Sequence, residues 1–195
     1  DEEVQMERPA FLQKDGMTGA EKGTVTHAFL QHADLELAGR DLEAEARRQE
    51  QLGLIARENV EKLDRPALKR FFAGELFRRI GKAKQALREY AFISAVPAAA
   101  LAETDEEKAG LDPKADTVLI QGVADLVLVF EDHVEIVDYK TDHNKTADEL
   151  LRDYAAQLRL YARAIGRRLA PNPVTRCTLY SFALGREVDV PLRGM

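Results

Sequence analysis

The second half of the chain contains two apolar runs that predict a β-hairpin. Residues 126–130 (LVLVF) and 134–137 (VEIV) are rich in aliphatic side chains, and a short polar break at 131–133 separates them. Aliphatic and β-branched runs divided in this way are typical of two antiparallel strands joined by a turn. We therefore expect a hairpin over residues 117–140.

Helical periodicity occupies most of the remaining sequence. Residues 147–169 carry apolar side chains every three or four positions, which predicts one long helix. Residues 19–81 are expected to be mostly helical, with amphipathic helices in 41–65, and the Pro and Gly residues of 97–116 indicate a loop. Three further strands are expected, near residues 87–94, 174–182 and 186–190. This order predicts an α/β fold in which a mixed central sheet is flanked by helices, some of them forming an N-terminal layer.

Charged residues interrupt the hairpin strands. Asp125 lies within the first strand, and Asp138 and Lys140 lie near the end of the second. Buried carboxylates cost several kcal/mol, roughly, unless a cation or hydrogen bonds compensate them. Asp138 and Lys140 are two positions apart and leave the same face of a strand, so pairing of the two strands would bring all three charges together. This arrangement suits a divalent metal ion.

An ordinary salt bridge at the end of a hairpin explains the same charges, because such pairs are common and add little stability. The long helix supplies a second signal. Gln157 and Tyr161 are four residues apart and therefore share a helix face. An amide and a phenol beside an acidic site could hold a phosphate backbone. A tyrosine at this spacing is also typical of the buried face of a helix.

Taken together, the segments IQGVAD, VDYKTD and QLRLY resemble the PD-(D/E)XK nuclease superfamily in its RecB-like branch, with G-x-x-D, D-x-K and Q-x-x-x-Y elements. The resemblance implies a restriction-endonuclease-like core. It assigns catalysis to Asp125, Asp138 and Lys140, and positioning of the substrate or of the lysine to Gln157 and Tyr161. Ala124 precedes the first aspartate where the family name has proline, a change that this branch tolerates.

The phrases RPAFLQ, GTVTHAFLQH and REYAFIS extend the resemblance over nearly the whole chain, to the C-terminal nuclease domains of the AddA subunits of bacterial AddAB helicase–nucleases. Gly23 and His27 form a G-x-x-x-H element. The family implies that His27 is a metal ligand, together with Asp125, Asp138 and the backbone carbonyl of Tyr139. By itself, a lone helical histidine is more often a core or surface residue.

Glu89, in REYAFIS, enters the predicted sheet just before the hairpin. An acid at this place could support the metal site or bind a second ion. The alternative is a charge at a strand edge, paired with Arg88 or another base.

Length and composition agree with one enclosed domain. The chain has 195 residues, 45% of them hydrophobic and 32% charged, as in an ordinary globular protein. We expect one nuclease domain over 1–195, with a helical part in 1–84 and the nuclease core in 85–195. The missing initiator Met and the family resemblance suggest a fragment of a longer helicase–nuclease chain. No apolar run is long enough to span a membrane and no signal peptide is evident, so a cytoplasmic location is expected.

The single cysteine, Cys177, lies in an apolar strand-like run and is expected to be buried. One thiol cannot hold an iron–sulfur cluster. The resemblance places such clusters in AddB and Cas4-type nucleases, so none is expected here.

The net charge of −6 argues against a nucleic-acid partner. The uneven distribution of the charges along the chain weakens this argument. Residues 66–88 contain seven basic side chains and the single acid Glu75, whereas acids crowd at 1–7, 41–50 and 103–107. The basic segment predicts either a DNA contact or simply a solvated helical face.

The function expected from the residues and the resemblance is Mg²⁺- or Mn²⁺-dependent hydrolysis of DNA phosphodiester bonds, as exonuclease or endonuclease, in double-strand break repair and recombination. The implied partners are DNA, single-stranded in particular, the helicase domains of a longer chain and an AddB-like subunit. The alternatives are an inactive nuclease-fold module for DNA binding or subunit docking, and a metal-dependent phosphoesterase with a small substrate. No phosphate-binding loop for ATP occurs in the sequence.

Overall fold

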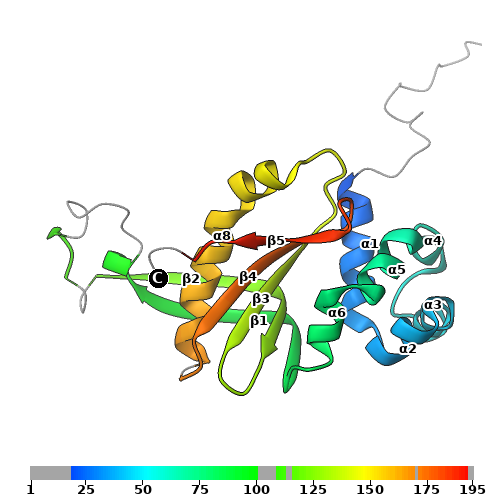
Figure 1. The fold of residues 1–195 in the computed structure, drawn as a ribbon, viewed down its shortest axis with the longest axis horizontal. Helices are drawn as coiled ribbons and strands as arrows, with labels where there is room; N and C mark the ends of the chain where they lie inside the picture. Colours follow the sequence, from blue (N-terminus) through cyan, green and yellow to red (C-terminus); the bar gives the residue numbers. More distant parts are fainter. Residues whose placement is uncertain (1–18, 101–108, 113–115, 170, 193–195) are drawn as a thin grey trace, which may run out of the picture.

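A computed structural model describes residues 19–100, 109–112, 116–169 and 171–192. Helices precede a sheet in which a single long helix is inserted (Figure 1). The helices are α1 (Gly19–His32), α2 (Leu35–Arg40), α3 (Leu42–Gln51), α4 (Arg57–Glu61), α5 (Arg65–Ala73), α6 (Glu75–Ile80), the short 3₁₀ helix η2 (Ala98–Ala100) and α8 (Ala147–Arg168). The strands are β1 (Gln85–Pro97), β2 (Thr117–Val129), β3 (Val134–Lys140), β4 (Val174–Ser181) and β5 (Arg186–Val190).

The described strands form one mixed sheet in the order β1-β2-β3-β4-β5. β1 pairs with β2, β2 with β3, and β4 with β5 in antiparallel fashion, whereas β3 and β4 are parallel. The parallel pair needs a crossover, and α8 provides it. Its first turn is fixed by a capping box in which Thr146 and Glu149 exchange hydrogen bonds.

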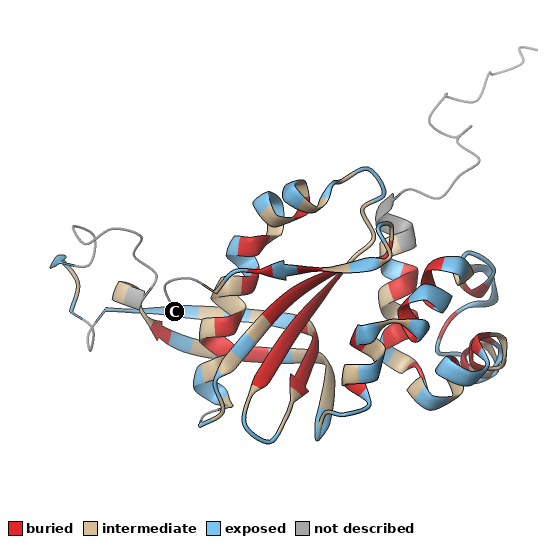
Figure 2. Ribbon diagram, in the orientation of Figure 1, coloured by how far each residue is buried: buried red, intermediate tan, exposed pale blue. Residues whose placement is uncertain are grey.

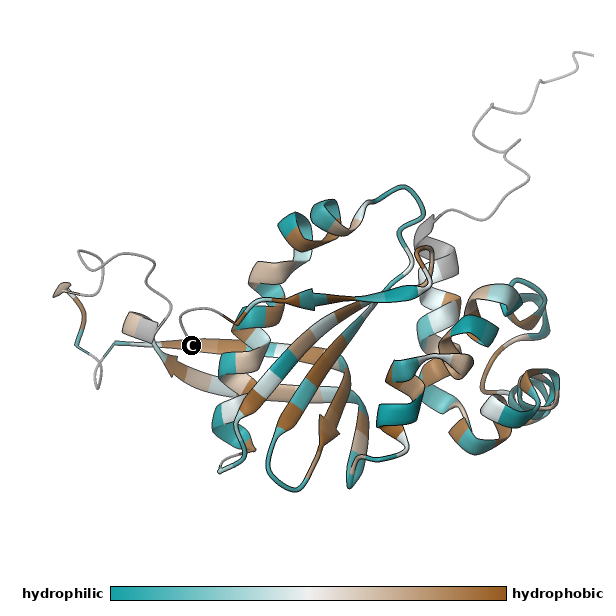
Figure 3. Ribbon diagram, in the orientation of Figure 1, coloured by the Kyte–Doolittle hydropathy of each residue, from teal (hydrophilic) through white to brown (hydrophobic). Residues whose placement is uncertain are grey.

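Each face of the sheet has its own core. On one side, Leu126, Val137 and Tyr139 pack with the helical layer α1–α6, whose most buried residues include Phe29 and Phe71. On the other side, the strands pack against α8. Burial is greatest in the central strands, and hydrophobic residues concentrate there (Figures 2 and 3). The expected mixed α/β architecture with an N-terminal helical layer is confirmed.

Element boundaries differ from the predictions mainly in β1. This strand begins earlier and ends later than the expected 87–94, because it pairs along nearly the whole length of β2, from Gln85 opposite Val129 to Pro97 opposite Thr117. The helix predicted over 147–169 ends at Arg168. Within the loop predicted over 97–116, residues 98–100 form η2, and residues 101–108 and 113–115 lie outside the described residues, as do the acids at 1–7.

The outer parts of β1 and β2 carry apolar side chains on a face that the helical layer does not cover. Ile93, Leu119 and Val123 are 49%, 64% and 46% exposed. None of the described helices has the length and hydropathy required to cross a membrane.

A buried polar network holds α3 against α1, the helix that carries His27. Glu45 is fully buried and accepts hydrogen bonds from Arg48, Gln49 and the Asp34 backbone N–H. Arg48 and Gln49 also donate to the backbone carbonyls of His32 and Phe29 in α1. The sequence predicted amphipathic helices over 41–65 without indicating that polar residues face inward, and Glu45 and Gln49 do so because their partners satisfy them.

A second ionic contact fixes the helical layer to the sheet. Arg79 of α6 donates to Glu135 of β3 at 3.0 Å and to both carboxylate oxygens of Glu187 of β5, at 3.0 and 2.6 Å. All three side chains are largely buried. Two-pronged guanidinium–carboxylate contacts are directional, so they set the position of α6 on the strands.

The burial of Cys177 makes a prediction about reactivity. Its side chain is 1% exposed, and burial raises the pKa of the thiol to about 12. Because the thiolate is the reactive species, we expect labelling by a thiol reagent at pH 8 to be at least about 100-fold slower in the native chain than in denaturant. The absorbance of the released reporter group measures this rate. Equal rates in both states would show that this part of the core is open.

Candidate active site

The candidate site lies where β2 and β3 stop pairing. The last pair of their ladder is Leu126 with Val137, so Asp125 and Asp138 come next on the two strands without being paired. On the other side of β2, Glu89 of β1 is skipped in the register at the position opposite Asp125, and its φ is 48°. A non-glycine residue with this backbone conformation costs about 1–3 kcal/mol and is found preferentially at functional sites.

The backbone of Tyr139 has no partner in β2, and two side chains contact its N–H and carbonyl groups instead. Its N–H donates to Asp125 Oδ2 at 2.6 Å. Its carbonyl oxygen lies 3.2 Å from His27 Nε2, and the other ring nitrogen of His27 lies 3.4 Å from Asp125 Oδ1. The ring of Tyr139 packs among aromatic residues of the helical layer. α1 thus brings His27 to Tyr139 of β3, although these residues lie 112 positions apart in the sequence.

The structure brings most of the predicted residues together, in a grouping that differs from the expected one. Ligand atoms of His27, Glu89 and Asp125 all lie within 4.8 Å of one another. Glu89, expected as a supporting acid, a ligand of a second ion or a paired charge at a strand edge, is therefore in the group. Asp138 turns to Lys140, with Oδ2 2.5 Å from Nζ. Despite that ion-pair contact, this buried oxygen accepts no hydrogen bond of ordinary geometry among the described residues.

Burial and neighbouring charges shift the pKa of Asp138, Glu89 and His27. Burial raises the pKa of Asp138 to about 6, because the effect of Lys140 in the opposite direction is smaller and Asp125 adds a further increase. Burial and the charge of Asp125 also raise the pKa of Glu89. Burial disfavours the charged form of His27, but the contacts with Asp125 and the Tyr139 carbonyl outweigh this and raise the pKa of the ring. Glu89 and Asp138 are therefore protonated more easily than free carboxyl groups.

Two glycines of the sequence motifs have a steric role. A Cβ on Gly23 would lie 2.8 Å from Thr141 Oγ1, so only glycine lets α1 approach the end of β3 closely. A Cβ on Gly122 would lie 2.7 Å from Tyr161 Oη. The G-x-x-x-H and G-x-x-D glycines thus set the distances at which His27 and α8 meet the strands.

Gln157 and Tyr161, predicted to position the substrate or the lysine, contact each other. Gln157 Nε2 donates to Tyr161 Oη at 3.2 Å, and the Tyr161 ring packs edge-on against Phe92. Of the described aromatic residues, it is Tyr154 whose ring lies under Lys140, with Nζ 4.1 Å from the ring centre. The sequence showed Tyr154 only as one apolar position of the helix, because residues fourteen apart have no local pattern.

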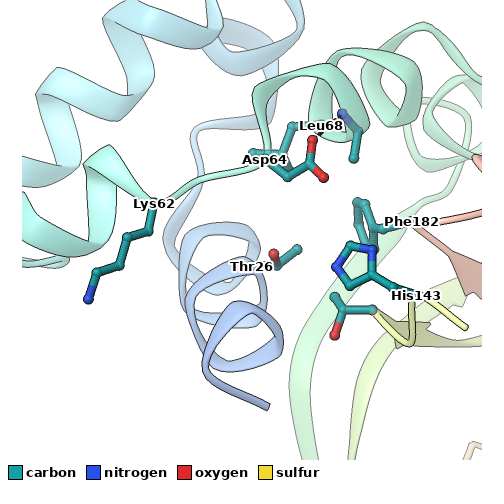
Figure 4. Close-up of a pocket in the computed structure, with 8 residues that line it drawn as sticks. Thr26, Lys62, Asp64, Leu68, His143 and Phe182 are labelled. Atoms are coloured by element: carbon teal, nitrogen blue, oxygen red, sulfur yellow. Dashed lines mark hydrogen bonds between the residues drawn. The ribbon is translucent and has the colours of Figure 1, made fainter. Parts of the chain in front are cut away.

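Two hollows border α1. The first is open and is lined by residues that include Gly23, Thr24, His27, Gln31 and Glu89. It gives access to the acid group, which is the name used here for His27, Glu89 and Asp125. The second is a smaller cavity of about 180 Å³ between α1, α5 and the segment after β3, where His143 and Phe182 lie near Thr26 (Figure 4). The two hollows have no lining residue in common, and only the first includes members of the acid group.

Three of the seven basic residues in segment 66–88 make internal contacts. Besides Arg79, Arg88 donates to the carbonyls of Leu30 and Ala33 at the end of α1, and Arg70 donates to the carbonyl of Phe182. Arg78 is paired with Glu75 on the surface. Arg79 and Arg88 therefore do not belong to a solvated face, whereas Lys69, Lys82 and Lys84 are exposed, and a DNA contact by this segment stays a prediction.

The donor set fits a hard divalent cation. Carboxylate oxygens, a backbone carbonyl and one imidazole are ligands that Mg²⁺ and Mn²⁺ accept. Asp138 Oδ2, without a hydrogen bond of ordinary geometry, and the raised carboxyl pKa values are what a cation would relieve. His27, Asp125 and the Tyr139 carbonyl oxygen would hold the ion, with Glu89 and Asp138 as the adjoining acids.

A mixed sheet with a crossover helix, acids at the point where two neighbouring strands stop pairing and a lysine beside them define a nuclease-type core. The sequence matches the model of the PD-(D/E)XK nuclease superfamily over residues 4–189, and the chain belongs to that family.

Curated relatives have similar sequences. The chain is 35% identical to the AddA-type subunit of the ATP-dependent helicase/nuclease of Heliobacterium modesticaldum, over 93% of its own length and 13% of the relative. It is 35% identical to the corresponding helicase/nuclease protein of Geobacillus kaustophilus, over 94% of the chain and 15% of the relative. It is 32% identical to the corresponding protein of Bacillus cereus strain G9842, over 94% of the chain and 15% of the relative. The resemblance to AddA is confirmed, and the chain spans about one seventh of these relatives.

The steric role of Gly122 can be tested by Gly122→Ala. We expect a loss of about 1–3 kcal/mol in the free energy of unfolding, because the added methyl group would press on the Tyr161 ring. Urea unfolding measures it. The loss should shrink in a Tyr161→Leu background, and Gly110→Ala, whose Cβ would meet open space, should be neutral. An equal loss in both backgrounds would contradict the contact.

The membership of Glu89 in the group can be tested by calorimetric titration with Mn²⁺. Glu89→Gln, Asp125→Asn and His27→Ala should each weaken binding by about tenfold or more, because each removes a charge or a ligand. Glu36→Gln, which changes an exposed acid of α2, should bind like the wild type. Unchanged affinity in Glu89→Gln would place Glu89 outside the metal site.

Proposed function

We propose that the chain hydrolyses DNA phosphodiester bonds with the help of Mg²⁺ or Mn²⁺. The observation that carries the proposal is the meeting of His27, Asp125 and the Tyr139 carbonyl at one point, with the pair Asp138 and Lys140 alongside. The membership of a nuclease superfamily supports the reaction class.

The roles follow from charge and position. Asp125 is fixed by the Tyr139 N–H and offers its second oxygen toward His27. Lys140 is a cation held beside the acids, where it can orient the attacking water or stabilise the charge that develops on the phosphate. A divalent ion bound by these residues would supply a bound water of lowered pKa and would neutralise phosphate charge. Gln157 and Tyr161 lie on the α8 side of β2 and are assigned to contacts with the DNA strand.

The wider setting is also a proposal. The relatives carry the name helicase/nuclease and are about seven times longer than the matched region. We infer that residues 1–195 form one nuclease domain of a longer, cytoplasmic polypeptide. That polypeptide would unwind DNA with ATP, deliver single strands to this site, act in break repair and recombination, and work with an AddB-like subunit.

The first test is incubation of the chain with end-labelled single-stranded and duplex DNA, with Mg²⁺ or with EDTA. We expect shortening that EDTA abolishes. Asp138→Ala and Lys140→Ala should each lower the rate by at least about 100-fold, because each removes a charge from the site. Circular dichroism should show an intact fold.

Matched controls lie in or near the hairpin turn, away from the site. Asp132→Ala and Lys84→Ala remove an exposed acid and an exposed base and should cleave at the wild-type rate. Wild-type cleavage by Asp138→Ala would contradict the proposal. Failure of the metal-loaded wild type to cleave any DNA would favour a binding or docking module instead.

A further inference from the structure

Lys140 is held between two different groups. On one side, its ammonium nitrogen lies 2.5 Å from Asp138 Oδ2. On the other side, it lies over the face of the Tyr154 ring, 4.1 Å from the centre. The side chain of Lys140 is only 16% exposed, so little water competes for either contact. An aromatic face attracts a cation without accepting its proton, and the attraction grows as water is removed.

Tyr154 is itself held in place by charged residues that take no part in the proposed chemistry. Its hydroxyl donates to the Asp142 carboxylate, at 3.2 and 3.3 Å from the two oxygens, and accepts from Lys145 Nζ at 2.9 Å. Lys145 also pairs with Asp142 and Asp153, at 3.0 and 3.2 Å. The capping box at Thr146 fixes the start of α8 next to this network.

Lys145 is a second cation on the same ring, 4.5 Å from its centre. Its two carboxylate partners neutralise it, whereas Lys140 has one carboxylate partner among the described residues, Asp138, which adjoins the proposed metal ligands. The ring therefore offers Lys140 an anchor that does not depend on Asp138. That anchor would persist when Asp138 turns toward a bound cation.

We infer that Tyr154 is a positioning residue for Lys140, whose ring face keeps the ammonium group at the site while Asp138 exchanges partners. The inference rests on the proposed function, since the position of Lys140 matters to the reaction only if the site cleaves DNA. Tyr154 is distinct from the motif residues Gln157 and Tyr161, which contact each other.

The first experiment replaces Tyr154 and measures cleavage of single-stranded DNA in Mg²⁺. Tyr154→Leu, which keeps bulk but loses the ring, should lower kcat by about 3- to 30-fold with KM for DNA unchanged. Tyr154→Phe, which keeps the ring, should restore most of the rate. A series of phenylalanines with one, two and three fluorines at this position should lower kcat stepwise, because fluorine weakens the negative face of the ring.

The same fluorinated series at Phe130 is the control. That ring stacks on His133 at the start of β3, at the other end of the strand from Lys140, and should show no trend in rate. If the wild type cleaves DNA and the series at Tyr154 is flat, the role of Tyr154 is wrong and the proposed function stands. If the wild type cleaves no DNA, both fail.

A second measurement does not depend on activity. Protons over an aromatic face are shifted upfield, so the ε-CH₂ signals of Lys140 should be upfield in spectra of chain labelled with ¹³C at lysine Cε. Lys140→Arg and Lys145→Arg identify the two signals. The upfield shift of the Lys140 signal should persist in Tyr154→Phe and vanish in Tyr154→Leu. The spectra with metal are recorded in Mg²⁺, because Mn²⁺ would broaden the signals. An unshifted Lys140 signal in the wild type would overturn the inference.

Discussion

The site depends on the place where β2 and β3 separate. Beyond Leu126 and Val137 the β2–β3 ladder ends, so Tyr139, which stays paired with β4, has no partner in β2. A buried N–H or carbonyl without a partner is costly. Asp125 accepts the hydrogen bond of the Tyr139 N–H, and His27 contacts the Tyr139 carbonyl. The two residues that satisfy these backbone groups are also two of the proposed metal ligands. The remainder of the fold serves to bring α1 and α8 to this opening.

Charge explains why the opening is suited to a cation. Glu89, Asp125 and Asp138 stand on three neighbouring strands, and Lys140 and His27, whose pKa is raised by Asp125 and the Tyr139 carbonyl, lie among them. Removing either of these two side chains would leave carboxylates near one another in a poorly hydrated place, which is unfavourable. A divalent ion would relieve this repulsion, and the ring of Tyr154 would keep Lys140 in place when Asp138 is drawn away.

The sequence predicted the order of elements well, because the hairpin and α8 have strong local periodicity and the mixed sheet follows from them. It also indicated Asp125, Asp138, Lys140 and His27 through motif resemblance. It offered Glu89 as a possible acid of the site but could not decide between that and a paired edge charge, since the outcome depends on a skipped position in the register of β1 and β2. Contacts between distant residues, such as Lys140 with Tyr154 and Arg79 with Glu187, likewise have no local signature. The inward Glu45 and the internal contacts of Arg79 and Arg88 were missed because charge alone predicts exposure.

The most direct test of the account is anomalous diffraction from crystals of the chain grown with Mn²⁺. The account predicts one strong anomalous peak within about 2.5 Å of ligand atoms of His27, Asp125 and the Tyr139 carbonyl. A peak elsewhere in the chain, or no peak at Mn²⁺ concentrations that saturate calorimetric binding, would contradict it.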